Sequence, residues 1–174
     1  MIDKSIKGVK YRLNEETLTA EVIKQENGYE GDIIIPETVV FQEVAYRVTS
    51  IGEGAFCQCE YLTSIVIPDS VTNIGQEAFE DCFSLEAIVI PNSVKSIGHC
   101  AFLGCKSLTS MVIPDSVTRI ITAAFYECKS LTSITFNGTK AQWKGIKLGK
   151  DWNARCPEIT VHCTDGEVAE PCRW

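Results

Sequence analysis

The stretch Leu62-Thr-Ser-Ile-Val-Ile-Pro-Asp-Ser-Val-Thr-Asn-Ile-Gly-Gln-Glu-Ala-Phe-Glu-Asp-Cys-Phe-Ser84 decides the fold, because its pattern returns every 23 residues. The returning positions are Leu62, Leu85, Leu108 and Leu131; Pro68, Pro91 and Pro114; Ile74, Ile97 and Ile120; Phe56, Phe79, Phe102 and Phe125; and Cys59, Cys82, Cys105 and Cys128. A unit this short cannot bury its own apolar face, so it must stack on its neighbours to make one continuous core. The sequence therefore predicts a solenoid.

The first part of the unit alternates like a short strand. Ile65 and Ile67 face one side while Ser64 and Val66 face the other, because side chains along a strand alternate with period 2. Pro68 ends the strand, since proline has no N–H to donate to a ladder. Every unit runs in the same direction, so we expect successive strands to pair in parallel.

The second part of the unit is predicted to be a short helical segment. Gly75 permits a change of direction, and residues 76–81 include good helix formers. Ala78, Phe79 and Cys82 are spaced as one buried stripe. The predicted fold class is therefore an α/β solenoid, with short parallel strands on one side of each unit and short helical segments on the other.

The consensus Leu-x-x-Ile-x-Ile-Pro-x-Ser-Val-x-x-Ile-Gly-x-x-Ala-Phe-x-x-Cys recurs at 62–82, 85–105 and 108–128. In the last unit Met111 replaces the first isoleucine and Ile121 replaces the glycine. This pattern resembles leucine-rich repeats and, more narrowly, the BspA-like (Treponema pallidum-type) class. The resemblance implies that the strands line a concave side and that the helical segments cover a convex side.

We expect one leucine-rich repeat domain over residues 1–174, closed by caps because a terminal repeat otherwise exposes its core. Val9–Leu13 and Leu18–Val22 alternate around a turn and predict a β-hairpin at the N-terminal end. An insert at residues 38–47 is rich in β-branched and aromatic residues and predicts a second hairpin. The expected divisions are an N-terminal cap (1–30), repeats (31–136) with an insert (38–47), an irregular C-terminal cap (137–166) and a loose tail (167–174).

Charge and composition exclude several classes of function. The net charge of −7 argues against a nucleic-acid partner. No apolar stretch approaches the roughly 20 residues that a membrane-spanning helix needs, so no membrane insertion is expected. Residues 1–10 lack the apolar core of a signal peptide. The charge is uneven, since residues 1–60 sum to −5 and residues 131–174 to +1, which favours head-to-tail self-association.

The cysteines and histidines offer no clear catalytic, cofactor or metal site. Four cysteines share the repeat register and are expected to form a ladder of buried thiols, in which parallel Cβ vectors disfavour disulfides. Near the C-terminus, free thiols, a disulfide involving Cys156 or Cys163, and a zinc site with His162 all remain open. His99 occupies a variable surface position. We therefore expect no enzyme and no cofactor.

The outward face of the predicted strands is the candidate protein-binding surface. Its apolar positions should align across neighbouring strands into one stripe about 20 Å long at the usual strand spacing. β-Branched residues also suit any parallel sheet, so the stripe has a structural explanation as well as a functional one. The candidate residues are Ile34, Ser64, Val66, Pro68, Ala87, Val89, Pro91, Ser110, Val112, Pro114, Ser133 and Thr135.

Two functions compete on this basis. The resemblance implies a non-enzymatic module, secreted or on the cell surface, that adheres to another protein such as a host matrix or cell-surface protein. The regular repeats and the uneven charge instead favour a structural spacer or self-associating piece of a larger surface assembly. Few charged or aromatic residues lie on the predicted face, which argues against carbohydrate.

Overall fold

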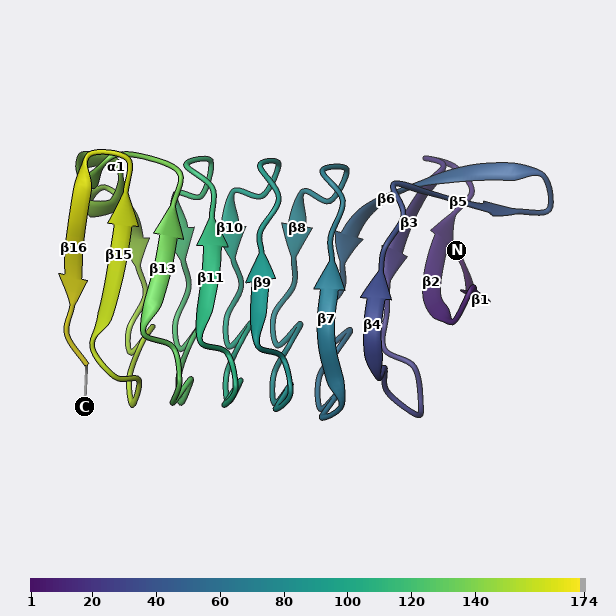
Figure 1. Cartoon of the computed structure of the whole chain (residues 1–174). Helices are drawn as coiled ribbons and strands as arrows, with labels where there is room; N and C mark the ends of the chain where they lie inside the picture. The colour runs from purple at the N-terminus through teal and green to yellow at the C-terminus, as the bar shows by residue number, and fades with distance from the viewer. Residues whose placement is uncertain (173–174) are drawn as a thin grey trace.

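The computed structural model describes residues 1–172 and shows a β-solenoid of flattened coils stacked along one axis (Figure 1). The strands that face the viewer in Figure 1 are called the front sheet here. They are β4 (Gly31–Ile34), β7 (Leu62–Val66), β9 (Ala87–Val89), β11 (Ser110–Ile113), β13 (Ser133–Phe136), β15 (Ile159–Cys163) and β16 (Gly166–Glu170). β4 pairs with β7, and the other five form one ladder in the order β16-β15-β13-β11-β9.

The remaining strands form one sheet behind the first, called the back sheet. Its order is β1-β2-β3-β6-β8-β10-β12-β14, and β5 pairs with β6. The strands are β1 (Ile2–Ile6), β2 (Val9–Asn14), β3 (Thr19–Val22), β5 (Thr38–Phe41), β6 (Val44–Ile51), β8 (Asn73–Ile74), β10 (Ser96–Ile97), β12 (Arg119–Ile120) and β14 (Lys147–Leu148). Each repeat thus contributes one strand to each sheet.

The parallel pairing follows the period of the sequence. Ser110 pairs with Ala87 on one side and with Ser133 on the other, so paired residues lie 23 positions apart. Ile88, Met111 and Ile134 point inward and are buried, whereas their neighbours point to solvent. The expected alternation of the front strands is therefore confirmed, and a one-residue slip would expose the whole apolar set.

The expected helical segments are wrong. Residues 76–81 and their equivalents form turns, and α1 (Lys140–Lys144) is the one α-helix within residues 1–172. Two residues of every turn have positive φ, which a right-handed helix does not allow. They are Gly54 and Gln58, Glu77 and Asp81, Cys100 and Gly104, Ala123 and Glu127, and Asp151 and Arg155.

Two ladders fill the space between the sheets. The rings of Phe56, Phe79, Phe102 and Phe125 stack with centroids 5.1, 5.1 and 5.5 Å apart. Beside them Cys59 begins the thiol ladder by accepting the N–H of Tyr29 at 3.2 Å, and four later thiols each donate to a phenylalanine carbonyl of the preceding coil. The donors are Cys82, Cys105, Cys128 and Cys156, at Sγ···O distances of 3.1, 3.1, 3.0 and 2.8 Å. The expected buried thiol ladder is present, and Cys156 extends it into the C-terminal segment.

Different structures cap the two ends of the solenoid. At the N-terminal end β1, β2 and β3 form an antiparallel extension of the back sheet, and it includes the expected hairpin as β2 and β3. The insert forms the expected hairpin too, as β5 and the start of β6, and projects as an arm (Figure 1). At the other end Trp152 packs edge-on against Phe125 and Trp143.

The expected loose tail requires a correction. Residues 166–170 form β16, which pairs antiparallel with β15 along its whole length. The Asn153 amide also donates to the carbonyl oxygen of Pro171 at 3.1 Å. The end of the chain is therefore part of the cap up to this point, while residues 173 and 174 lie outside the described part of the chain.

Candidate functional site

A row of β-branched side chains runs along the outward face of the front sheet. Ile34 pairs with Val66, Val89 with Val112, and Val112 with Thr135, while β7 lies beside β9. The exposed fractions of Ile34, Val66 and Val89 are 72%, 56% and 61%. The four apolar members, Ile34, Val66, Val89 and Val112, are called the valine row below.

The row continues in polar residues toward the C-terminal end. Thr135 pairs with His162, whose exposed ring lies 3.0 Å from the Glu167 carboxylate, measured from Nδ1 to Oε1. Sequence reasoning placed His162 among possible zinc ligands and missed its position in this row. The sequence does indicate this position, because Val161-His162-Cys163 alternates between inward and outward residues like the other front strands.

A second row of small side chains flanks the first. Ala87, Ser110 and Ser133 are aligned, and Ser64 pairs with Asp32. The hydroxyls of Ser64 and Thr63 donate to the Asp32 carboxylate at 2.6 and 2.9 Å. These hydrogen bonds, that of Ser64 first, hold the pKa of Asp32 below its usual value. The result is a smooth surface with one fixed negative charge at its N-terminal end.

The prolines of the expected surface require a correction. Pro91 and Pro114 are buried and Pro68 is half-buried, so they add little to the outward face. The chain turns toward the core directly after each front strand. The Pro91 carbonyl accepts from the N–H of Val94, and the Pro114 carbonyl from that of Val117, at 3.1 Å each. The prolines therefore shape the turns that end the strands.

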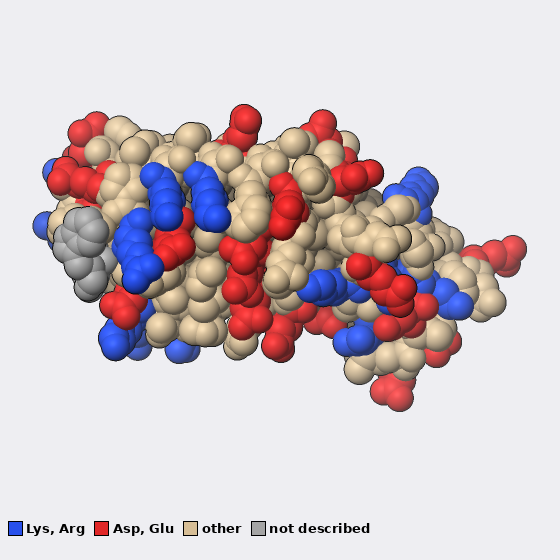
Figure 2. Space-filling view, turned by 90° about the horizontal axis from the view of Figure 1, so that it is seen from below, with Lys and Arg blue, Asp and Glu red and all other residues tan. Residues whose placement is uncertain are grey.

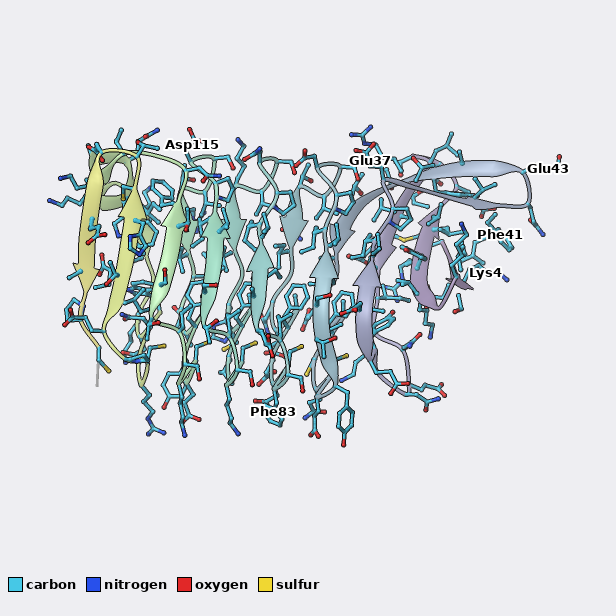
Figure 3. The ribbon with its side chains drawn as sticks, in the orientation of Figure 1. Lys4, Glu37, Phe41, Glu43, Phe83 and Asp115 are labelled. Atoms are coloured by element: carbon cyan, nitrogen blue, oxygen red, sulfur yellow. The ribbon has the colours of Figure 1, made fainter. Side chains whose placement is uncertain are left out.

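An apolar cavity of about 370 Å³ lies at the N-terminal end of the valine row. Ile34 belongs both to the row and to the cavity wall. The other walls are Ile6, Lys7, Val9 and Tyr11, from the first two strands and the turn between them, and Pro36, Thr38, Val39 and Val40, from the base of the arm. Between the first strand and the arm, Lys4 Nζ lies 4.9 Å from the centre of the Phe41 ring (Figure 3).

The turns at one edge of the solenoid carry an uneven charge. Figure 2 views these turns and shows acidic side chains over the middle and basic ones toward the C-terminal end. Glu77, Glu80 and Asp81 belong to one turn. Burial and then the neighbouring charges of Glu77 and Asp81 raise the pKa of Glu80. Beyond them Arg155 binds Glu127 at 2.6 Å.

The same edge holds a cysteine and a histidine in contact, but without the electrostatics of a nucleophile. The ring of His99 lies 3.0 Å from the Thr122 carbonyl oxygen, which only Nδ1–H can satisfy. Nε2 is then an acceptor for the thiol of Cys100 at 3.2 Å. Burial, followed by the charges of Glu80 and Glu77, raises the pKa of Cys100. A thiol held in its protonated form does not suit nucleophilic catalysis.

The C-terminal cysteines and His162 are not gathered into a metal site. Cys156 is committed to the thiol ladder, and His162 faces outward toward Glu167. Across residues 1–172 no group of three or more histidine, cysteine or acidic side chains has the geometry to hold a metal ion. In the same part of the chain, no helix has the length and apolar character needed to cross a membrane.

Solved structures of bacterial repeat proteins resemble this one. A leucine-rich repeat protein from Bacteroides ovatus is 33% identical, with a TM-score of 0.69 over 86% of this chain and 41% of that one. The Treponema pallidum leucine-rich repeat protein (19% identity, TM-score 0.50, 89% of each chain) and the pneumococcal vaccine antigen PcpA (18%, 0.61, 95% of this chain and 50% of that one) share the fold.

The chain spans less than half of the Bacteroides ovatus protein. No curated protein matches it in a sequence search. A family model for BspA-type leucine-rich repeat regions matches residues 37–145 in six copies, which agrees with the repeat pattern and with the two-sheet coil. The chain belongs to the BspA-type leucine-rich repeat family.

Proposed function

We propose that this chain is a non-enzymatic recognition module that binds another protein through the outward face of its front sheet. Proteins built from leucine-rich repeats generally serve as protein-interaction modules. The observation that supports this face is the valine row, in which three side chains more than half exposed lie on adjacent strands. Single apolar residues on a surface need no explanation, but an aligned row forms the continuous apolar strip that interfaces use.

The surroundings of the row favour a protein over other ligands. Serines, an alanine and threonines flank it, and small uncharged side chains let a partner approach closely. No tryptophan, tyrosine or phenylalanine side chain projects from the row to stack on a sugar ring. The net charge of −7 disfavours a polyanion. The family further suggests adhesion at the cell surface, with a matrix or surface protein as the partner.

Three lysine substitutions on the row test this proposal. The Val66→Lys/Val89→Lys/Val112→Lys variant should fold, because these side chains face outward, and should lose binding to any partner found in a panel of immobilised matrix and surface proteins. The matched control places three lysines on exposed positions of the back sheet and its turns, at Thr72, Asn73 and Thr118. Loss of binding in both variants would point to charge alone and contradict the proposed face.

Self-association is the second candidate, and the uneven charge along the chain favours it. The net charge of residues 1–60 is −5 and that of residues 131–174 is +1. The N-terminal end of one copy is therefore attracted to the C-terminal end of another. Sedimentation velocity over a range of concentrations separates the two functions. Growth into larger species that added salt disperses would support a self-associating spacer, whereas a monomer that binds a panel protein would support recognition.

A further inference from the structure

At the N-terminal end of the solenoid, the back sheet extends further than the front sheet. The back sheet continues through β3, β2 and β1, whereas the front sheet stops at β4 (Figure 1). Within residues 1–172, β4 pairs with β7 and with no other strand. The place beside β4 that one more front strand would take is therefore without a strand, although the back sheet behind it is complete.

The backbone of β4 offers hydrogen-bonding groups at this open edge. The N–H groups of Gly31 and Ile35 donate to carbonyl oxygens at the two ends of β7, at 2.9 and 3.0 Å. Successive peptide groups of a strand point to opposite edges, so the N–H and C=O groups of Asp32 and Ile34 point away from β7. An edge of this kind is a template for another strand.

Two cavities lie along the same edge. The apolar cavity of about 370 Å³ adjoins Ile34 and Pro36 at the C-terminal end of β4. A second cavity, of about 400 Å³, adjoins Glu30 and Ile33 at the N-terminal end. The turn between β1 and β2 borders both, through Lys7 in the first and Gly8 in the second. The two cavities, which lie between β4 and this turn, are together called the groove below.

The charge of the β4 wall selects among possible occupants. Between Lys24 and Arg47 the chain has no basic residue and five acidic ones, Glu26, Glu30, Asp32, Glu37 and Glu43. Glu30 and Asp32 are exposed beside the groove, and Glu37 follows its end (Figure 3). On the opposite wall Lys7 is the basic side chain. The β4 side is thus acidic above an apolar floor that includes Val9 and Val39.

We propose that the groove binds an extended peptide segment of another protein, which adds to β4 as one more strand of the front sheet. The segment alternates apolar side chains, which enter the cavities, with lysine or arginine side chains, which lie beside Asp32 and Glu30. Its main chain bonds to the N–H and C=O groups of Asp32 and Ile34. Strand addition of this kind combines main-chain affinity with side-chain pockets. The site is separate from Val66, Val89 and Val112.

The probe is a phage-displayed library of random 12-residue peptides, selected on the full 174-residue chain. The expected result is enrichment of peptides that alternate apolar and basic residues and lack proline. Hydrogen exchange with the best peptide should slow the amides of Asp32 and Ile34 and leave that of Ile33, which already faces β7, unchanged. Failure to enrich any peptide, or unchanged exchange at Asp32 and Ile34, would overturn the proposal.

Variants locate the peptide. Ile34→Pro removes an N–H from the open edge without removing one from the β7 ladder and should weaken binding about tenfold, whereas Ile34→Thr keeps the N–H and should bind nearly as well as the unmodified chain. Val40→Lys, at an exposed wall position, should repel a basic peptide in a chain that folds normally. The Val66/Val89/Val112 lysine variant should keep full peptide binding. If Ile34→Pro and Val40→Lys both bound the peptide as well as the unmodified chain, the site would be refuted. This outcome would stand even if the valine row binds a protein.

Discussion

Several single residues in this protein have the same structural role in each coil, because their positions recur with the repeat. From Cys82 onward each thiol of the ladder is buried, yet its S–H donates to a carbonyl oxygen of the preceding coil. Cysteine suits this position because it packs like a small apolar side chain and still donates a weak hydrogen bond. Each accepting phenylalanine carbonyl also accepts the N–H of the cysteine three residues further along its own coil, so the thiol adds a second hydrogen bond that links neighbouring coils. The cysteines therefore have a structural role, and their number does not imply disulfides.

The buried thiols predict that the protein loses stability in alkali. Burial above all raises the pKa of Cys82, Cys105 and Cys128 above the ordinary value of a thiol. A group whose pKa is higher in the folded state stabilises the fold fully below its unfolded pKa, and this contribution is lost as the pH rises toward the folded value. Above about pH 8.5 each such thiol should lower the free energy of unfolding by roughly 1.4 kcal/mol per pH unit.

Urea unfolding between about pH 7 and pH 10, with reductant present, measures this slope. Tyr11 and Tyr29 add to it only above about pH 10, since burial raises the pKa of both to about 12. Cys105→Ala should be less stable at neutral pH but should show a slope shallower by the contribution of one thiol. A free energy of unfolding that stays constant up to about pH 10 would contradict the proposed protonation of the ladder.

At the scale of elements, the sequence predicted strands and hairpins well and the turns poorly. The front strands show apolar residues with a period of 2, and the insert shows alternating β-branched and aromatic residues. A short stretch of sequence is therefore enough to predict these elements. The back strands β8, β10 and β12 have two residues each, too few to show a period. The turns mislead because Ala123, Glu77 and Glu127 favour helices, while packing between coils holds them at positive φ.

The strained turns predict a stabilising substitution. Ala123 has φ of 54°, a conformation that costs a residue with a Cβ roughly 1–2 kcal/mol and glycine almost nothing. Glycine gains freedom in the unfolded chain, which offsets about half of this benefit. Ala123→Gly should therefore raise the free energy of unfolding by about 0.5–1 kcal/mol in urea titrations.

Ala124→Gly is the control for this change. Ala124 is fully buried and lies outside the positive-φ positions, so its loss should destabilise the protein by about 1 kcal/mol. Together the adjacent pair separates the effect of backbone conformation from that of glycine itself. Equal destabilisation of both variants would mean that the left-handed turn carries no strain.

The whole molecule is a stack in which each coil contacts only its neighbours. The sequence therefore predicted the solenoid and the alignment of the valine row, because both follow from a period of 23 residues. It could not predict the groove beside β4, which arises where two sheets end at different coils. The place of Cys156 in the thiol ladder was missed for a related reason, since the segment around α1 displaces it from the repeat spacing.

The same architecture predicts that damage stays close to where it is made. Trp152 is fully buried at the C-terminal end, where it packs against Phe125 and Trp143. Trp152→Ala should speed amide hydrogen exchange in β13 and β15 while exchange in β2 and β3 stays unchanged, because stability in a stack is a sum over neighbouring contacts. Phe102→Ala removes a ring from the middle of the stack. It should cost about 3–5 kcal/mol and speed exchange on both sides of its coil, in β9 and β11. If Trp152→Ala instead sped exchange equally at both ends, the chain would unfold as one unit rather than coil by coil.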